Sequence, residues 1–172
     1  MKLKIPKRKL QIGVIGGEEK NLPSNNRRKI LEIAKKLGKE IAKNDAILLT
    51  GGMSGVMEAA SQGAYENGGI TVGTPGRTRK MSNPWVVVEI CTPIDIGDYL
   101  FAGIPSCDAI IVLPGGIGTL AEALIASRYK KPLIFIKDLD FEISKNIKLN
   151  NKFIVNSAEE AVKISIKLAN KK

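Results

Sequence analysis

Three glycine-containing segments of this sequence combine residue types that could bind a phosphate group. They contain Gly16 and Gly17 in the first, Gly51, Gly52, Ser54 and Gly55 in the second, and Gly115, Gly116, Gly118 and Thr119 in the third. Each segment follows a short apolar stretch and precedes a pattern typical of a helix. Glycine lets a phosphate approach the backbone closely, and the start of a helix offers unpaired N–H groups and a positive dipole end. We therefore predict that a phosphorylated ligand or a phosphate binds at these turns.

Apolar stretches alternate with helical patterns along the chain, which is typical of a parallel sheet covered by helices. We expect helices near residues 24–43, 54–66 and 119–129, and a last one that begins with a capping box at residues 157–160. The expected strands are residues 10–15, 46–49, 70–73, 85–90, 109–113, 133–136 and 153–155. This order predicts the α/β class, with a Rossmann-like doubly wound parallel sheet in three layers and a single domain. The carboxyl ends of parallel strands share one edge, so the three glycine segments should meet there.

None of the three segments matches a common nucleotide-binding motif. No Gly-Lys-Ser/Thr sequence follows them, so they are not a Walker A loop. They also differ from the dinucleotide fingerprint G-x-G-x-x-G, and Thr50 stands where an acidic ribose ligand would follow the second strand. These differences argue against NAD, FAD and ATP hydrolysis of the P-loop kind.

The length and composition indicate one domain, residues 1–172, with its core at about residues 10–172 behind a basic tail at residues 1–9. Hydrophobic residues make up 44% of the chain and aromatic residues only 5%, so the core must be aliphatic. No apolar stretch is as long as a bilayer span, and the N-terminus lacks the apolar core of a signal peptide. We expect a cytoplasmic protein that does not contact a membrane.

The chain contains no histidine, and this excludes several kinds of chemistry. A Ser-His-Asp triad, a Cys-His pair and a histidine-ligated zinc are all ruled out, and we expect no metal site. Any general acid or base must be a carboxylate, a lysine, a tyrosine or a cysteine. Cys91 and Cys107 form no CxxC motif, and two cysteines are too few for a disulfide framework.

The net charge of +10 raises the question of a polyanionic partner. Many of the lysines lie near the two ends of the chain, and Lys35, Lys36, Lys39 and Lys43 fall on one expected helix. A solvated surface explains them better than a nucleic-acid site does. Arg77 and Arg79 differ, because their loop at residues 74–84 follows a strand on the same edge as the glycine turns. They either close over an anionic ligand or belong to a solvated loop, and the sequence leaves both interpretations open.

The third glycine segment adds two functional groups. Thr119 stands at the expected start of a helix, where its hydroxyl could cap the helix or bind a phosphate oxygen. Glu122 follows three residues later, within the expected first turn, so its carboxylate could face the ligand. A simple capping box, T-x-x-E, explains both residues equally well. Glu58, near the start of the preceding expected helix, poses the same question, and there a structural role is favoured.

Residues 114–122, Pro-Gly-Gly-Ile-Gly-Thr-Leu-Ala-Glu, resemble the PGGxGTxxE motif of the LOG family, proteins long called lysine decarboxylases. Residues 51–58 are similar to the second glycine turn of that family, GGGxxGxM. The resemblance covers about residues 10–137. It places the chain nearest a branch that includes YvdD-like proteins and molybdenum cofactor carrier proteins, with DNA-processing DprA as a more distant relative.

The resemblance implies a Rossmann-like fold and a homodimer or homotetramer. In the enzymatic members it also implies hydrolysis of a nucleoside 5′-monophosphate to a free base and ribose 5-phosphate. Glu122 matches the catalytic glutamate of the motif, whose partner is an arginine on the helix before the PGG strand. Residues 97–106 contain no arginine or lysine, and Tyr99 or a neighbour takes that position. The missing arginine argues against hydrolysis but leaves phosphate binding intact.

Three functional hypotheses follow from these observations. The first is a protein that binds or carries a phosphorylated, nucleotide-like ligand, such as a nucleotide, a phosphate or a molybdopterin-type cofactor, and requires no cofactor of its own. The second is a phosphoribohydrolase that uses Glu122. The third is DNA binding like that of DprA, which rests on net charge and a distant fold analogy, so nucleic acid is not the expected partner.

Overall fold

The computed structural model describes residues 5–92, 102–139 and 148–171. Its seven strands form one parallel sheet in the order β4-β3-β2-β1-β5-β6-β7. The strands are β1 (Gln11–Ile15), β2 (Ile47–Thr50), β3 (Thr71–Gly73), β4 (Val88–Glu89), β5 (Ala109–Val112), β6 (Leu133–Ile136) and β7 (Lys152–Val155). The chain builds outward from β1 to β4 and then restarts beside β1 with β5. This reversal confirms the predicted doubly wound α/β sheet.

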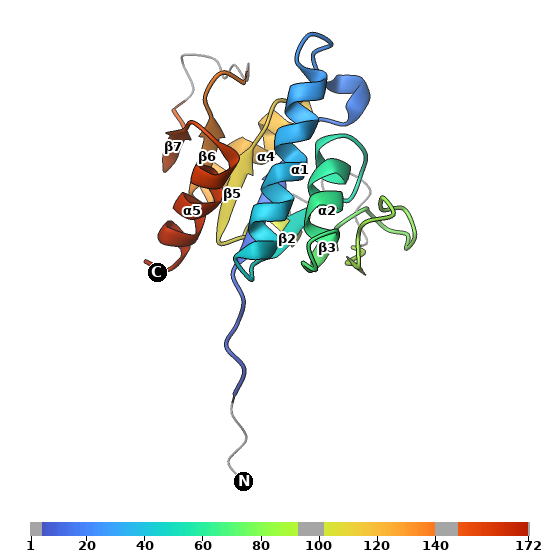
Figure 1. Cartoon of the computed structure of the whole chain (residues 1–172), viewed down its shortest axis with the longest axis vertical. Coiled ribbons are helices and arrows are strands. Elements are labelled where there is room, and N and C mark those ends of the chain that lie inside the picture. The colour runs from blue at the N-terminus through green and yellow to red at the C-terminus, as the bar shows by residue number, and fades with distance from the viewer. Residues whose placement is uncertain (1–4, 93–101, 140–147, 172) are drawn as a thin grey trace.

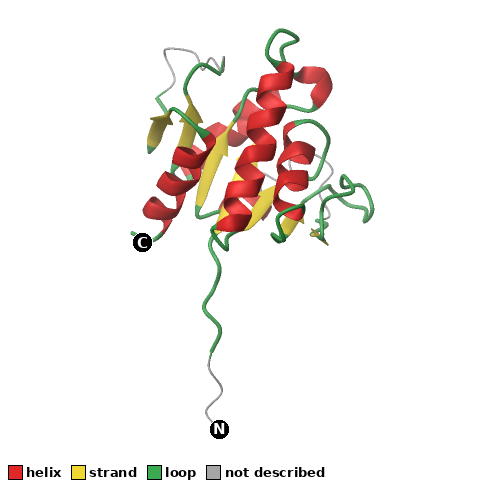
Figure 2. Ribbon diagram, viewed as in Figure 1, coloured by secondary structure: helices red, strands yellow, loops and turns green. Residues whose placement is uncertain are grey.

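Helices cover both faces of the sheet. They are α1 (Arg27–Lys43), α2 (Val56–Tyr65), α3 (Ile104–Ser106), α4 (Ile117–Arg128) and α5 (Ala158–Ala169), with a 3-10 turn, η1 (Glu19–Asn21), after β1. Figure 1 shows α1, α2 and α5 in front of the sheet and α4 behind it, and Figure 2 shows the same three layers by type of element. The layers place the starts of α1, α2 and α4 at the carboxyl ends of the strands.

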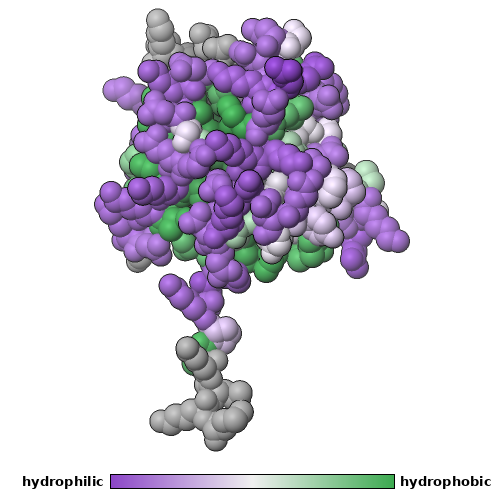
Figure 3. All heavy atoms as spheres, in the orientation of Figure 1, coloured by the Kyte–Doolittle hydropathy of each residue, from purple (hydrophilic) through white to green (hydrophobic). Residues whose placement is uncertain are grey.

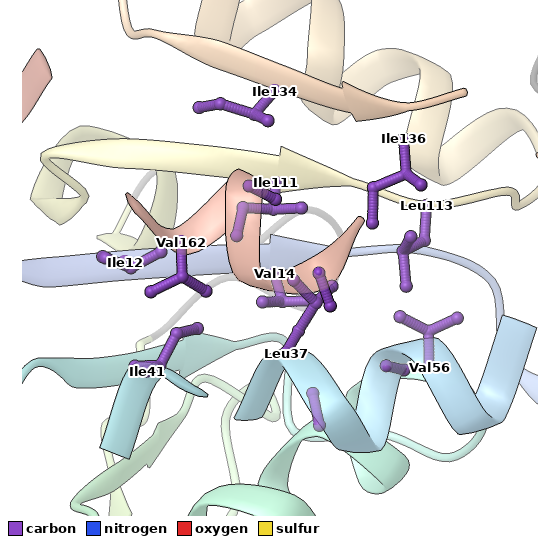
Figure 4. Close-up of a cluster of buried hydrophobic side chains, with 14 of the residues drawn as sticks. Ile12, Val14, Leu37, Ile41, Val56, Ile111, Leu113, Ile134, Ile136 and Val162 are labelled. Carbon is purple, nitrogen blue, oxygen red and sulfur yellow. The ribbon is translucent and has the colours of Figure 1, made fainter. Parts of the chain in front are cut away.

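Alternating side chains of the strands build two cores, one on each face. Ile12, Val14 and Ile111 point toward α1 and α5, where Leu37 and Val162 meet them (Figure 4). The alternate positions of the same strands pack against α3 and α4 on the other face, and they include Ile15, Ile110, Val112, Leu133 and Phe135. Successive side chains of a strand point to opposite faces, so a strand that is covered on both sides is apolar throughout. This confirms the central position predicted for residues 109–113.

The outward surfaces of the front helices are mainly hydrophilic, as Figure 3 shows. Lys36, Lys39 and Lys43 are exposed on α1, as predicted for a solvated face. Residues 5–9 are also exposed, and they lead away from the folded body (Figure 1). Within the described residues, none of the helices is long and apolar enough to span a membrane.

Several element boundaries differ from the predictions. The strand expected at residues 85–90 is reduced to Val88–Glu89, because Asn83 forms a turn that holds Trp85 and Val86 away from the ladder. The helix expected from residue 119 begins at Ile117. The predicted capping box of α5 is confirmed in part. Ser157 accepts a hydrogen bond from the Glu160 N–H, but the Glu160 carboxylate binds the N–H of Asn156 instead of that of Ser157.

Two glycines let α1 and α2 touch through their backbones. A Cβ at Gly38 would lie 1.9 Å from the carbonyl oxygen of Ala60, and a Cβ at Gly63 would lie 1.9 Å from that of Lys35. The close crossing fixes the two helices to each other. It therefore also fixes the start of α2, which the second glycine turn directly precedes.

Replacement of Gly38 by alanine should destabilise the fold, because the new methyl group would collide with the α2 backbone. Overpacking costs about 1–3 kcal/mol of unfolding free energy and occasionally more, and a rigid backbone partner places this case at the upper end. Urea unfolding measures the loss.

Gly118→Ala is the matched control for this experiment. It is also a glycine-to-alanine change within a helix, but nothing lies within 4 Å of the added Cβ. Its unfolding free energy should equal that of the wild type or exceed it by up to about 1 kcal/mol. Equal stability of the Gly38→Ala and Gly118→Ala proteins would contradict the close crossing.

Candidate functional site

The three glycine turns meet at the carboxyl edge of the sheet, and Gly17 joins them. Its N–H donates to the carbonyl oxygen of Pro114 at 2.9 Å, which links the β1 turn to the β5 turn. Its own carbonyl oxygen accepts a hydrogen bond from the N–H of Val56 at 3.1 Å, which links the β1 turn to the start of α2. The predicted gathering of the turns is therefore confirmed. It lies at the point where strand order reverses, between β1 and β5.

Most of these glycines are explained by the packing of one turn on another. A Cβ at Gly115 would lie 2.5 Å from the nitrogen of Gly17, and a Cβ at Gly17 would lie 3.0 Å from the Cα of Gly115. Gly55 has a φ of +71°, and a Cβ there would lie 2.5 Å from the carbonyl oxygen of Gly17. A Cβ at Gly16 would lie 2.6 Å from the Val56 side chain. These four glycines let the three turns pack closely against one another.

The β2 turn is filled by the chain itself. Gly52 has a φ of +80°, and a Cβ at this residue would lie 2.7 Å from the hydroxyl oxygen of Ser82, which comes from the loop between β3 and β4. Thr50, which replaces the acidic ribose ligand of dinucleotide-binding folds, accepts a hydrogen bond from the Gly52 N–H through its hydroxyl at 3.1 Å. Gly51 and Ser54 are half-buried beside it.

Gly116 and Gly118 differ from the other glycines, because the packing of the chain does not require them. Both are exposed. A Cβ at Gly118 would have nothing within 4 Å, and one at Gly116 would meet only the Asn21 side chain at 4.0 Å. Glycine within a helix is less favourable than alanine by about 1 kcal/mol. Within the described residues, the space that side chains at these two positions would occupy is therefore open.

The α4 N-terminus presents donors to this open space. The first hydrogen bond within the helix runs from the N–H of Leu120 to the carbonyl of Gly116, at 3.2 Å. The N–H groups of residues 117–119 precede it and have no partner within the helix. They carry the positive end of the helix dipole, which favours an anion at this position.

The structure corrects the predicted positions of Thr119 and Glu122. The N-cap of α4 is Gly116, in an extended conformation with φ −86° and ψ −157° and no side-chain cap. Glycine and isoleucine at residues 116–118 let the helix begin two residues earlier than predicted. Thr119 is therefore the third helical residue, and Glu122 lies in the second turn. The capping-box interpretation of these two residues is wrong, and so is the placement of Glu122 in the first turn.

Glu122 is a half-buried carboxyl group. Removal from water raises its pKa from 4.5 to about 8, since burial disfavours the charged form. Across residues 5–92, 102–139 and 148–171, no hydrogen bond or ion pair to this carboxyl group is found. The group is therefore mainly protonated at neutral pH, in which form it can donate a proton but cannot accept one.

Glu58 is the third residue of α2 and lies in its first turn, half-buried. It lines a hollow of about 370 Å³ between η1, α1 and α2, together with Glu19, Lys35 and Gln62. A carboxylate in the first turn of a helix is stabilised by the helix dipole, and this supports the structural role predicted for Glu58. Among the described residues, no cluster of three or more acidic or cysteine side chains could hold a metal ion.

Sequence reasoning missed the residues that shape the loop between β3 and β4. Arg77 and Arg79 are exposed on this loop, at the edge where the glycine turns lie. Ser82, Asn83 and Glu89 fix its course. The Asn83-Pro84 dipeptide was the available signal, because Asn-Pro favours the start of a turn. Tyr99, which the resemblance puts at or next to the family arginine position, lies outside the described residues.

Residues 9–163 match the SLOG cluster4 family. The chain belongs to this family. A relative from Archaeoglobus fulgidus is 33% identical over 128 residues, which make up 74% of this chain and 80% of that protein.

Solved structures share the whole architecture. The molybdenum cofactor binding protein from the phototrophic bacterium Rippkaea orientalis has a TM-score of 0.81 and 33% identity, over 95% of this chain and 99% of that chain. The molybdenum cofactor carrier protein from Chlamydomonas reinhardtii has a TM-score of 0.77 and 30% identity, over 96% and 100%. DprA from Helicobacter pylori has a TM-score of 0.58 and 16% identity, over 92% and 80%, which shows a common fold alone.

The raised pKa of Glu122 predicts a loss of stability as the pH rises. Between pH 4.5 and about 8 the folded state keeps a proton that the unfolded chain has released, so the unfolding free energy falls across this interval. The Glu122→Gln variant has no ionisable group at this position. Its unfolding free energy relative to that of the wild type should therefore rise by about 2 kcal/mol between pH 5 and pH 8.5, after allowance for solvent screening. Urea unfolding of both proteins at the two pH values measures this. A difference that does not change with pH would contradict a buried, protonated carboxyl group.

Proposed function

We propose that this protein binds a phosphorylated, nucleotide-like ligand at the α4 N-terminus and carries a molybdopterin-type cofactor. The observation that carries the proposal is the open space beside Gly116 and Gly118 at the start of α4, where, within the described residues, the N–H groups of residues 117–119 have no partner in the helix. Gly118 lies within the helix, where glycine costs stability, and neither Gly116 nor Gly118 relieves a contact within the described chain. A phosphate that must approach the backbone accounts for both residues.

The residues of this edge would have different roles in binding the ligand. The N–H groups of residues 117–119 would bind the phosphate, together with the hydroxyl of Thr119, which is buried against Gly115. The glycines of the first two turns, Gly16, Gly17, Gly51, Gly52 and Gly55, would form the floor with Ser54, while Gly115 would join them to α4. Arg77 and Arg79 would add positive charge from the neighbouring loop. A molybdopterin-type cofactor ends in a phosphate, so its anionic end fits this set of donors.

The relatives support the carrier function. Two proteins that cover nearly all of this chain, at 33% and 30% identity, are described as molybdenum cofactor binding and carrier proteins. The PGGxGTxxE-like sequence at residues 114–122 supports the link to the LOG family and its YvdD-like branch. By the same resemblance, we propose that the protein is a homodimer or a homotetramer.

Gly118→Ala should retain the fold and lose the ligand. The added methyl group points into space that the chain leaves open, so unfolding should be unaffected, whereas a phosphate at the helix N-terminus would be displaced. We expect at least a tenfold loss of bound pterin when the variant is purified from cells that make the molybdenum cofactor. Fluorescence of the oxidised pterin measures the amount bound.

Ile117→Ala is the control, since it truncates a side chain that is 89% exposed in the same turn but keeps its N–H group in place. It should bind as the wild type does. Normal binding by Gly118→Ala, or no pterin on the wild type, would overturn the proposal.

A phosphoribohydrolase is the second candidate, and the position of Glu122 one turn inside α4 is the observation in its favour. At neutral pH its carboxyl group is mainly protonated and therefore a poor base, so we expect no ribose 5-phosphate from AMP at pH 7. A coupled assay for ribose 5-phosphate checks this. Release that disappears in Glu122→Gln would establish the hydrolase instead of the carrier.

A further inference from the structure

The loop between β3 and β4 is held on one side by the carboxylate of Glu89. One oxygen of this carboxylate accepts a hydrogen bond from the N–H of Lys80 at 2.7 Å, and the other accepts one from the N–H of Ser82 at 2.9 Å. Lys80 has a φ of +68°, a conformation that costs a non-glycine residue about 1 kcal/mol or more. The paired hydrogen bonds stabilise the backbone in this conformation. They also lower the pKa of Glu89, so the carboxylate stays charged at neutral pH.

Asn83 holds the same loop on the other side, against the β2 turn. Its N–H donates to the carbonyl oxygen of Gly52 at 2.7 Å. Its side-chain amide donates to the carbonyl oxygens of Gly52 and Met53, each at 3.0 Å. The Asn83 side-chain oxygen accepts a hydrogen bond from the N–H of Trp85 at 3.2 Å. Asn83 therefore joins the loop to the second glycine turn by backbone and side chain together.

Ser82 lies between these two attachments. Its hydroxyl oxygen would be 2.7 Å from a Cβ at Gly52 and 2.9 Å from one at Gly73, so the missing side chains of both glycines make room for it. The loop thus packs over the carboxyl ends of β2 and β3, which remain hydrogen-bonded to each other. Direct contacts with the rest of the chain therefore hold this loop in place, unlike a loop that contacts only solvent.

We propose that Glu89 and Asn83 are positioning residues that fix the Arg77–Lys80 segment at the ligand edge, so that its cations attract the phosphate of the ligand. The inference rests on the proposed function, because it assigns the loop to the same site. The loop leaves β3 and α4 follows β5, with β2 and β1 between these two strands, and neighbouring strands lie about 4.8 Å apart. The loop and the α4 N-terminus therefore follow strands about 14 Å apart at the same edge of the sheet.

The alternative is a loop that is ordered for stability alone. In that case, release of the loop would make it accessible to proteases without any change in ligand affinity. The two interpretations separate when loop order and ligand binding are measured on the same variants.

The first measurement is the order of the loop. Glu89→Gln keeps the shape of the side chain but replaces one acceptor oxygen with an amide group, which cannot accept from both backbone N–H groups. Trypsin should cleave after Arg77, Arg79 or Lys80 at least tenfold faster in this variant than in the wild type. Asn83→Asp removes the side-chain donor to the carbonyl oxygens of Gly52 and Met53, and trypsin should cleave this variant faster to a similar extent. Cleavage as slow as in the wild type would overturn the positioning role.

The second measurement is the affinity for AMP and its dependence on salt. Glu89→Gln should weaken AMP binding about tenfold and flatten the salt dependence, as Arg77→Ala/Arg79→Ala should do. Adding Glu89→Gln to the double-arginine variant should cause no further loss, because the two changes remove one interaction. Glu159→Gln is the matched control, since its carboxylate is also paired, with Lys36, but lies on α5, which follows β7 at the opposite end of the sheet from the loop. It should alter neither measurement.

The outcomes distinguish the inference from the proposed function. Faster cleavage with unchanged AMP affinity and salt dependence would overturn the inference and leave the proposed function standing. If the wild type binds neither AMP nor a pterin phosphate, both are overturned. Faster cleavage together with weaker, less salt-dependent AMP binding, and no further loss in the triple variant, would support both.

Discussion

The backbone of Gly17 is the constraint on which the ligand edge depends. Its N–H binds the β5 turn, its carbonyl oxygen binds the start of α2, and the absence of a side chain lets Gly115 approach. Strand order reverses at this point, so α1 and α4 leave toward opposite faces of the sheet. A Cβ at residue 17 would lie 3.0 Å from the Cα of Gly115, so the β5 turn would have to move by a few tenths of an ångström.

The positive charge at this edge has two sources, which are the backbone N–H groups at the α4 N-terminus and the side chains of a loop. The unpaired N–H groups of α4 supply a fixed partial charge, because the helix is held by packing of Ala123 and Ala126 against the sheet. The cations of residues 77–80 stand on a separate loop, whose course is set by Glu89 and Asn83. The Glu89 carboxylate thus lies within a basic loop, where it binds two backbone N–H groups and also interacts with the charge of Arg79. Such a site can hold an anion without a histidine or a metal ligand.

The chemistry of this site fits the function of a carrier better than that of a hydrolase. Glu122 lies one turn inside α4, and burial keeps its carboxyl group protonated at neutral pH. The open part of the site is the helix terminus itself, where Gly116 and Gly118 are exposed. Backbone donors at a helix terminus bind a phosphate strongly but add no acid or base. Binding and release of a ligand require no catalytic acid or base.

The sequence alone determined the fold class, the strand order expected of a doubly wound sheet, and the edge at which the three glycine turns meet. These features follow from local periodicity and from the common direction of parallel strands. The tertiary structure decided which glycines serve packing, which two face open space, and how the loop at residues 74–84 lies. Those answers depend on distances between segments far apart in the chain, such as Gly17 and Gly115 or Ser82 and Gly52. A glycine that makes room for its own chain and a glycine that makes room for a ligand look the same in a sequence.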